Sequence, residues 1–282
     1  MLKMNLLESW NSRTIDEVLQ SKFFSKKVLH LLRMNKDITL NGKPIRLNHK
    51  IEQTGELILP DVIDASSDYA RSVRFCDVVY EDDYVAIVVK QRGVKTHPNE
   101  QHELNTLMNH AMNTIDSDYL EPIHRLDQET KGLLILCKHP YVKSTFDTML
   151  DQRLISRFYI ANVHNNESLS AQTIDLPIGK DSTHANKRRI SNRGQQATTH
   201  IVDFIDYNNG KFPILKLDTG RQHQIRVHLE AIGHSIIGDP LYSDSHLRNL
   251  ALCAYKIEFV HPYTEELISV EIPLEDIDFL ND

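Results

Sequence analysis

A histidine, an arginine and an aspartate stand together in the segment His124-Arg125-Leu126-Asp127, shortly before an apolar run at 133–137. The apolar run has the length and composition of a buried strand. A carboxylate at the entrance to such a strand can be held on the floor of a cleft, where it could act as a nucleophile or as a base. From physical chemistry alone, a surface Arg–Asp pair in a loop is the simpler interpretation, so this segment does not decide the function by itself.

Two further segments carry polar groups that could serve a site. Residues 220–229 read Gly-Arg-Gln-His-Gln-Ile-Arg-Val-His-Leu, and residues 157–159 read Arg-Phe-Tyr. Taken alone, Tyr159 is typical of a core or strand aromatic. His223 and His228 lack the four-residue spacing of a helical zinc pair, and no His-Glu-x-x-His string occurs, so the sequence predicts no metal site. The absence of Gly-x-Ser-x-Gly and of a Walker-type loop argues against serine hydrolases and nucleotide hydrolases.

These segments together carry a resemblance to a known family. His124-Arg125-Leu126-Asp127, with Thr130 and Gly132, resembles the catalytic signature of the RluA-type pseudouridine synthases, and residues 220–229 resemble a second signature of that family. Weaker matches follow in the family's order, at 80–82, 85–90, 93–98, 157–159, 194–199, 238–242 and 261–262. The resemblance covers roughly residues 75–275. The sequence departs from the family at four positions, which concern the choice of substrate more than the chemistry: Lys131, Gln91, Ser235 and Cys253.

The resemblance implies an isomerisation. Such an enzyme breaks the bond between ribose and the uracil nitrogen, turns the base and rejoins it through a ring carbon. Asp127 would be the essential carboxylate, acting either as nucleophile or as a base on the ribose. Tyr159 would stack on the uracil and help to remove the ring-carbon proton. Burial would raise the pKa of Asp127, and the resemblance assigns the opposing guanidinium to Arg221. Because atoms are conserved, we expect no cofactor and no metal.

The implied partner is RNA. A base in a duplex or folded loop must be extruded before it can react, at a cost of a few kcal/mol. Arg125, next to the catalytic aspartate, could fill the vacated stack, since RNA recognition commonly uses arginine stacking. The residues expected to contact RNA are Arg125, His124, Thr130, His223, Gln224, Arg226, Lys26, Lys27, Arg33 and Lys36.

The bulk composition is that of an ordinary globular protein of 282 residues. Its net charge of −7 argues mildly against a nucleic-acid partner, but residues 21–50 hold eight Lys and Arg against a lone Asp37. That stretch is either a solvated face or a binding patch. Three widely spaced cysteines form no disulfide framework, which favours a reducing cytoplasm. No apolar run approaches the ~20 residues of a membrane span, and no signal peptide is evident. We expect a monomer with no protein partner.

The pattern of elements predicts two parts. Residues 1–66 should form a small basic module with helices near 14–19 and 28–32, a hairpin about Asn41-Gly42 and a last strand at 57–59. This module loosely resembles the alpha-L RNA-binding motif. Residues 61–75 are polar and are expected to be a linker. Residues 67–282 should form the catalytic domain, with helices starting at Pro140 and near 222–232. The family resemblance implies an α+β fold with a mixed, largely antiparallel sheet and a central catalytic cleft.

Two other functions remain open at this point. A non-catalytic RNA-binding or ribosome-assembly factor could retain the fold, although loss of the aspartate would signal it and Asp127 is present. A nucleoside hydrolase or glycosylase working with two carboxylates would release free base. Among RNA substrates, ribosomal RNA is favoured over transfer RNA.

Overall fold

The computed structural model describes residues 1–35, 37–63, 66–100, 102–243 and 249–281. The chain begins with a four-stranded sheet covered by two short helices. Its strand order is β1-β4-β2-β3, with bounds β1 Leu2–Leu6, β2 Thr39–Leu40, β3 Lys43–Pro44 and β4 Gly55–Leu59. The helices are α1 Ile15–Ser21 and α2 Lys26–Met34, and a short 3-10 helix, η1, covers Glu8–Trp10. We call residues 1–60 the N-terminal module.

Local chemistry accounts for these elements. The side chains and backbone of Thr14 and Glu17 form a reciprocal capping box at the start of α1. Asn41 and Gly42 both have positive φ, 50° and 75°, which is the backbone of the tight turn that joins β2 to β3. The predicted helices, hairpin and last strand are therefore confirmed, while β1 was not predicted.

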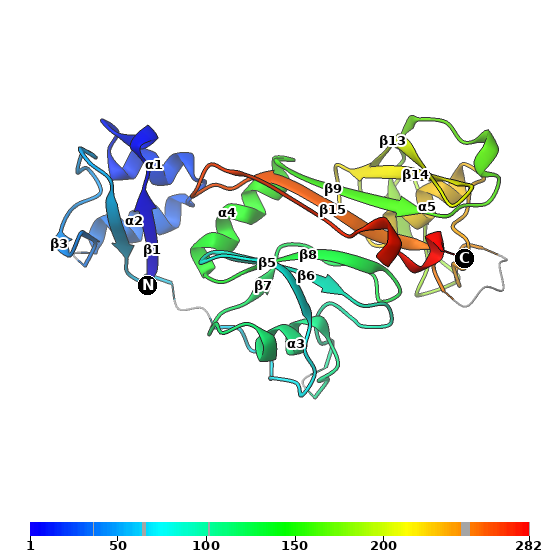
Figure 1. The fold of residues 1–282 in the computed structure, drawn as a ribbon, viewed down its shortest axis with the longest axis horizontal. Coiled ribbons are helices and arrows are strands. Elements are labelled where there is room, and N and C mark those ends of the chain that lie inside the picture. The colour runs from blue at the N-terminus through cyan, green and yellow to red at the C-terminus, as the bar shows by residue number, and fades with distance from the viewer. Residues whose placement is uncertain (36, 64–65, 101, 244–248, 282) are drawn as a thin grey trace.

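The rest of the chain is built on a ten-stranded sheet, ordered β10-β13-β14-β9-β15-β8-β6-β5, with β16 beside β15 and β7 beside β8 (Figure 1). Its strands are β5 Asp77–Glu81, β6 Val85–Lys90, β7 Glu121–Pro122, β8 Lys131–Cys137, β9 Ile155–Ala161, β10 Gln172–Asp175, β13 Thr198–Tyr207, β14 Gly210–Leu217, β15 Leu252–Val260 and β16 Leu267–Glu271. A separate hairpin pairs β11 Ile178–Lys180 with β12 Arg188–Ile190. The remaining helices are α3 Leu107–Thr114, α4 Pro140–Asp151, α5 Gln224–Ala231, η2 Asn166–Ser168, η3 Leu274–Asp276 and η4 Asp278–Leu280.

Among the described strands of this sheet, only β15 and β8 run parallel, and the other pairs are antiparallel. The fold is thus α+β with a mostly antiparallel sheet, as expected. The parallel pair meets at Gly132, whose φ is 142° and where a Cβ would lie 2.4 Å from the carbonyl oxygen of Ala254. Only glycine allows that close approach, which gives a physical reason for the glycine that ends the first signature.

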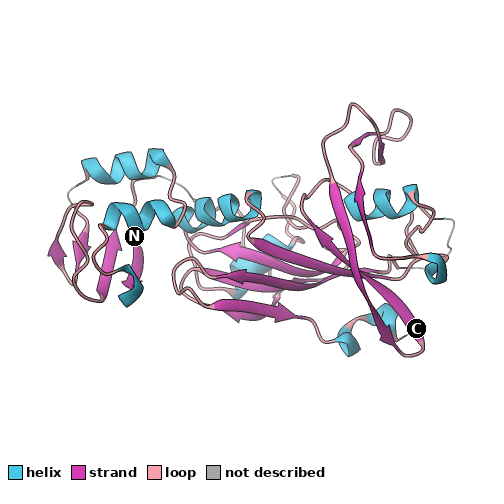
Figure 2. Ribbon diagram, turned by 90° about the horizontal axis from the view of Figure 1, so that it is seen from above, coloured by secondary structure: helices cyan, strands magenta, loops and turns pink. Residues whose placement is uncertain are grey.

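The N-terminal module lies at one end of the molecule, beside α4 and the hairpin between β15 and β16 (Figures 1 and 2). Glu265, in that hairpin, accepts hydrogen bonds from Trp10 Nε1 at 2.7 Å and Lys22 Nζ at 2.8 Å. Thr145 of α4 donates to the carbonyl of Lys22. Buried apolar residues of the module belong to the same continuous core as those of the main sheet.

The described part of the expected linker is irregular but bound to its surroundings. The Ser67 hydroxyl donates to the carbonyl of Leu120, and the Tyr69 hydroxyl donates to Glu121. Asn109 of α3 donates to the carbonyl of Ala70. The segment is therefore irregular, as its polar sequence suggested, but hydrogen bonds and partly buried apolar side chains such as Val62 and Tyr69 hold it against the main core. Its role as a linker stays a prediction. The division into two domains at residue 66 stays a prediction.

Candidate active site

Asp127 lies in the loop of residues 123–130, which joins β7 to β8. The loop is held on both sides of the aspartate. Thr96 Oγ1 donates to the carbonyl of Leu126 at 3.0 Å and accepts from its amide at 3.2 Å. Lys90 Nζ, fully buried, donates to the carbonyl of Gln128 at 3.0 Å. Both neighbours of the aspartate are thus fixed to the end of β6 and the segment that follows it.

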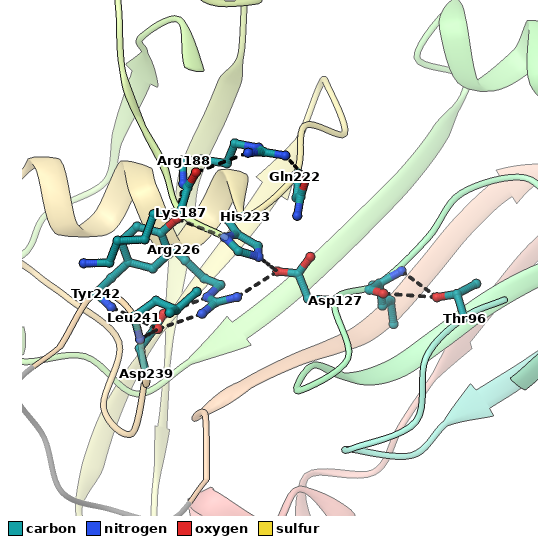
Figure 3. Close-up of polar contacts among 11 residues, drawn as sticks. Thr96, Asp127, Lys187, Arg188, Gln222, His223, Arg226, Asp239, Leu241 and Tyr242 are labelled. Carbon is teal, nitrogen blue, oxygen red and sulfur yellow. Dashed lines mark hydrogen bonds and ion pairs between the residues drawn. The ribbon is translucent and has the colours of Figure 1, made fainter. Parts of the chain in front are cut away.

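The carboxylate of Asp127 faces a buried arginine from α5. Arg226 Nη1 donates to Asp127 Oδ2 at 3.2 Å, while its Nε and Nη2 bind the two oxygens of Asp239 at 2.8 Å each (Figure 3). Asp239 is fully buried, and the amides of Leu241 and Tyr242 donate to its Oδ1. The fork of Arg226 is therefore oriented by Asp239, so that its third nitrogen meets the carboxylate of Asp127.

Arg226 stays charged in this position. Burial disfavours the charged form, but hydrogen bonds and charge from Asp239, together with the charge of Asp127, outweigh burial and raise its pKa. The ring of Tyr242 lies 5.1 Å from the guanidinium carbon, in reach of a cation–π contact. A permanent positive charge thus stands beside the carboxylate.

This geometry corrects the expected neighbour of Asp127. Arg221 lines the same cavity but is exposed, and its Nε donates to the carbonyl of Gln196 at 3.0 Å. Arg226 occupies the place beside the carboxylate that was expected for Arg221, because α5 begins only at Gln224 and turns residue 226 inward. Arg226 was expected to contact RNA, and its three donor groups are instead committed to Asp127 and Asp239.

His223 lies near the same carboxylate oxygen. Its Nε2 is 3.9 Å from Asp127 Oδ2, and its Nδ1 is 2.9 Å from the hydroxyl of Tyr242. Burial lowers the pKa of His223, so we treat the imidazole as neutral at neutral pH. The residue takes a left-handed backbone, φ 58°, as it caps α5. Figure 3 shows the imidazole and the guanidinium of Arg226 converging on Asp127.

Asp127 opens onto a cavity of about 450 Å³ whose wall also includes Tyr159 and Arg157 of β9. The side chain of Tyr159 is buried, with the residue 4% exposed. Burial raises the pKa of Tyr159, and the charge of Asp127 adds to that shift while Arg157 opposes it. The phenol therefore keeps its proton at neutral pH. A carboxylate, a phenol and a guanidinium thus meet in a cleft large enough for one nucleotide base.

The other residues of the first signature have different surroundings. Arg125 is exposed, and no hydrogen bond or ion pair of its side chain is found among the described residues. His124 and Thr130 lie in the cavity wall, and the Thr130 amide closes the loop on the Asp127 carbonyl. All three expected RNA-binding residues of this segment therefore border the cavity.

Gln224, at the start of α5, is occupied within the protein. It is 3% exposed. Both ends of its side-chain amide are used by four neighbours: Thr219, Arg221, Thr198 and Thr199. The expected RNA contact of Gln224 is corrected, because no polar atom of its side chain remains free.

In the N-terminal module, Lys26 and Lys27 are exposed at the start of α2. Arg33 is occupied by Asp16, with Nη2 at 2.8 and 2.9 Å from the two carboxylate oxygens. Lys36 lies outside the described residues.

Several residues that build the site had no role assigned to them from the sequence, although most fall within the quoted strings. They are Lys90, Thr96, Arg157, Asp239 and Tyr242. The Gly-Asp-Pro-Leu-Tyr string at 238–242 was the one signal for the last two.

Metal ligation and membrane insertion find no support in the described part of the chain. There, no three His, Cys, Asp or Glu side chains are grouped so that they could hold a metal ion. In the same ranges, no helix has both the length and the apolar character needed to cross a bilayer.

Comparisons with known proteins identify the family of this chain. Residues 84–231 match the family described as RNA pseudouridylate synthase, and residues 2–57 match the RluD ribosomal pseudouridine synthase N-terminal domain. The uncharacterized RNA pseudouridine synthase YhcT of Bacillus subtilis (strain 168) is 34% identical over 258 residues, 88% of this chain and 85% of that protein. The ribosomal large subunit pseudouridine synthase D of Pseudomonas aeruginosa (strain PAO1) is 29% identical, covering 86% of this chain and 82% of its own.

The fold has a solved counterpart. Human RNA Pseudouridylate Synthase Domain Containing 1 superposes with a TM-score of 0.58 at 22% identity, over 77% of this chain and 89% of its own. That likeness supports the fold, and the matches in sequence support the chemistry. The chain therefore belongs to the RNA pseudouridylate synthase family and is an RNA pseudouridine synthase, an isomerase of uridine in RNA.

Proposed function

We propose that this enzyme modifies specific uridines of ribosomal RNA and that Asp127 is its essential carboxylate. Two findings favour ribosomal over transfer RNA. The N-terminal module matches a domain named for a ribosomal pseudouridine synthase, and several relatives are named ribosomal large subunit pseudouridine synthase D. Transfer RNA is the alternative that the experiment below distinguishes.

One observation carries the catalytic assignment. Asp127 projects from a doubly tethered loop into the cavity, with Arg226 at 3.2 Å and the phenol of Tyr159 in the same wall. A uracil inserted beside Tyr159 would place its ribose against the carboxylate. The carboxylate could then attack the ribose or remove a proton from it. A guanidinium fixed by Asp239 holds the carboxylate without needing to move, which is how a preorganised charge aids a reaction.

Tyr159 has a second role in the proposal. Because it keeps its proton at neutral pH, it can donate a hydrogen bond or serve as a stacking platform without carrying charge. The ring-carbon proton must leave at the end of the reaction. Tyr159 is the side chain that we assign to relay it: its oxygen takes up the ring-carbon proton while its own hydroxyl proton passes, through water in the cavity, to the ring nitrogen released from the ribose, which ends the reaction protonated.

Arg125 has a separate role, in opening the substrate. It borders the cavity, is exposed and has no partner among the described residues. Its guanidinium is therefore free to occupy the space that an extruded base leaves in the RNA stack.

The test is to map pseudouridines in ribosomal and transfer RNA from three strains. One carries the gene, one lacks it, and one expresses the Asp127→Asn variant in its place. We expect at least one ribosomal position to lose its pseudouridine in the second and third strains only. Loss confined to transfer RNA would overturn the substrate assignment. Retention of every pseudouridine with the variant would overturn the role of Asp127.

The two other functions are separated by the products. A non-catalytic RNA-binding factor would leave all pseudouridines in place when the gene is removed. A glycosylase would release free uracil from RNA incubated with the purified protein, whereas an isomerase conserves the base in the strand. Chromatography of the incubated RNA and of its supernatant measures both quantities in one reaction.

A further inference from the structure

An arginine in the active-site cavity is buried without a counter-charge. Arg157 of β9 is 5% exposed and lines the cavity. Its Nε is buried and has no hydrogen-bond partner, and its side chain makes no ion pair within the part of the chain that the structure describes. An unpaired buried charge is costly, so buried charges in proteins are ordinarily paired or hydrogen-bonded.

The cavity's own carboxylates do not serve this guanidinium. Asp127 is bound by Arg226, and Asp218 is bound by Arg153 at 2.9 Å. Asp151 is exposed at the end of α4. Arg157 therefore has no acid of its own among the described residues of the cavity, because the two half-buried carboxylates there, Asp127 and Asp218, are paired with other arginines.

A histidine beside the arginine also lacks a side-chain partner. Both ring nitrogens of His124 are buried and meet no side-chain donor or acceptor among the described residues, although the backbone of Arg125 lies close to the ring. Burial, together with the positive charge of Arg157, lowers the pKa of His124 to about 3, so its imidazole is neutral and offers one N–H donor. Buried polar groups left without partners in a cleft point to a ligand that would satisfy them.

The space next to the guanidinium is open. A Cβ at Gly220 would lie 3.4 Å from Arg157 Nη1, so the absence of a side chain at that position leaves room beside the charged group. Gly220 opens the second signature and is exposed. A ligand group can thus reach the guanidinium from the solvent side, where a strand of RNA would approach.

The strand geometry places this opening beside the base site. Arg157 and Tyr159 are two residues apart on β9, so their side chains lie on one face, separated by roughly 6–7 Å along the strand. Phe158 between them points to the opposite face, where Lys216 lies over its ring. A nucleotide with its base at Tyr159 and its ribose at Asp127 can carry its backbone toward Arg157.

We propose that Arg157 and His124 form a subsite for a backbone phosphate of the nucleotide that enters the cavity. The proposal rests on the function proposed above. A phosphate supplies the missing counter-charge, and the guanidinium fork matches two of its oxygens. The His124 N–H supplies a further donor. A neutral uracil carbonyl would accept a hydrogen bond but would leave the charge of Arg157 uncompensated.

The test uses the full chain and three probes: uridine, uridine 5′-monophosphate and ribose 5-phosphate. Binding is followed by calorimetry and by the ring-nitrogen NMR signals of His124, assigned by comparison with His124→Gln. We expect uridine 5′-monophosphate to bind at least ten-fold more tightly than uridine. Both phosphates should shift the His124 signals, and uridine should leave them in place. Equal affinities of uridine and its monophosphate, or unshifted His124 signals, would overturn the proposal.

Arg157→Gln and Arg153→Gln form the matched pair of variants. Both remove one guanidinium from the cavity wall, but Arg153 is exposed and paired with Asp218. We expect the ten-fold preference for the monophosphate to fall within two-fold in Arg157→Gln and to persist in Arg153→Gln. The melting temperature of Arg157→Gln without ligand should not fall below that of the wild type, because the substitution breaks no native ion pair. A large drop would show that the arginine is structural and would contradict the proposal.

Arg157→Lys covers the case in which the glutamine variant does not fold. It keeps the charge but loses the planar fork, so the preference for the monophosphate should weaken without vanishing. None of these measurements needs turnover. A failed phosphate subsite with ribosomal modification intact would overturn this inference alone, while absent pseudouridine formation with phosphate binding intact would overturn the proposed function.

Discussion

At the scale of single residues, Asp127 is the centre of the proposed chemistry. We expect Asp127→Asn to lower the single-turnover rate at least about 1000-fold, a barrier increase of ~4 kcal/mol, while RNA binding survives. The amide keeps the shape and can still accept from Arg226, but it cannot act as a carboxylate nucleophile or base. Rates measured at saturating enzyme, with filter binding on the same RNA, test this. A rate within ten-fold of the wild type would remove Asp127 from the chemistry.

Arg226 and Arg221 provide a sharper contrast, since the family resemblance pointed to Arg221 and the structure places Arg226 beside Asp127. Arg226→Lys keeps a charge but loses the fork that joins Asp239 to Asp127, so we expect a loss of about 1–3 kcal/mol in unfolding free energy and at least a ten-fold lower rate. Arg221→Lys, on the surface, should change stability by less than about 0.5 kcal/mol and the saturated rate by less than three-fold. Urea unfolding and single-turnover assays measure these effects for both variants. If Arg221→Lys lowers the rate as much as Arg226→Lys does, Arg221 also takes part in the reaction.

The signature around Asp127 predicted the carboxylate and its loop, and the second signature predicted the helix that faces it. Neither could say which arginine points inward. That depends on where the helix starts, and His223 delays the start by adopting a left-handed conformation. The role of Asp239 was not predicted for a related reason. Asp239 orients Arg226 through a bidentate contact across 13 positions of the sequence, and no local pattern encodes such a contact.

At the scale of elements, the loop that carries Asp127 is held by the segment after β6. Thr96 makes two hydrogen bonds to the backbone of Leu126, the residue before the aspartate. Thr96→Val preserves the shape and removes both, so we expect about 1–3 kcal/mol of destabilisation and at least a ten-fold lower saturated rate. Thr145→Val is the control, because Thr145 of α4 is also buried and makes two hydrogen bonds, but its partners are the carbonyl of Lys22 and the hydroxyl of Tyr263. Thr145→Val should lower the free energy of unfolding by a similar amount and leave the saturated rate unchanged. If Thr145→Val lowers the rate as much as Thr96→Val does, the hydrogen bonds of Thr96 have no particular effect on the reaction.

Lys90 donates a hydrogen bond to the same loop, and its titration makes the stability of the folded protein depend on pH. Burial lowers its pKa to about 7, although the charges of Asp127 and Glu129 oppose the shift. The folded pKa therefore lies below the unfolded value of about 10.4, and the unfolded chain binds more protons between the two. The contribution of Lys90 to stability is complete above the unfolded pKa and is lost as the pH falls toward 7.

We therefore expect the wild-type free energy of unfolding to rise from pH 7.5 to 9 relative to Lys90→Met, by up to about 1.4 kcal/mol per pH unit. Urea titrations of both proteins at each pH measure the difference, and groups common to both cancel. The variant should also be less stable at every pH, because the carbonyl oxygens of Gln91, Val94 and Gln128 share the N–H groups of Lys90 and would lose them. Parallel pH profiles would show that Lys90 keeps its proton throughout this range.

Elements with a strong local signal were predicted well, and those stabilised by distant partners were not. Pro140 at the first turn and Gly233 after the last mark α4 and α5 in the sequence. Strand β1 pairs with β4, whose residues lie about fifty positions later, and helix α3 is only eight residues long, with six of them buried. Such elements are defined by what they pack against rather than by their own composition.

At the scale of the whole molecule, the N-terminal module is joined to the main sheet by a shared core. Tyr141 of α4 donates to the carbonyl of Pro60 and accepts from the amide of Val62, and its ring packs on Phe24. The carboxylate of Glu265 accepts hydrogen bonds from the side chains of Ser9, Trp10 and Lys22. Composition cannot reveal these contacts, because a polar segment that is bound to its surroundings reads like a free linker. Deleting the module would uncover this interface, so its role in RNA binding is better tested by substitution.

The last prediction concerns Lys26 and Lys27, exposed at the start of α2 and without ion-pair partners among the described residues. If the module binds RNA phosphates, the double change to Gln should weaken RNA binding and flatten its dependence on salt, by roughly 0.7–0.9 in slope for each phosphate that is no longer neutralised. The rate at saturating enzyme should not change, since no described residue of the N-terminal module lines the cavity that holds Asp127. The control is Lys143→Gln with Lys256→Gln, which removes two charges already neutralised by Asp147 and Glu258. Binding isotherms at several salt concentrations compare the two proteins, and identical slopes would mean that the basic face of α2 is only solvated.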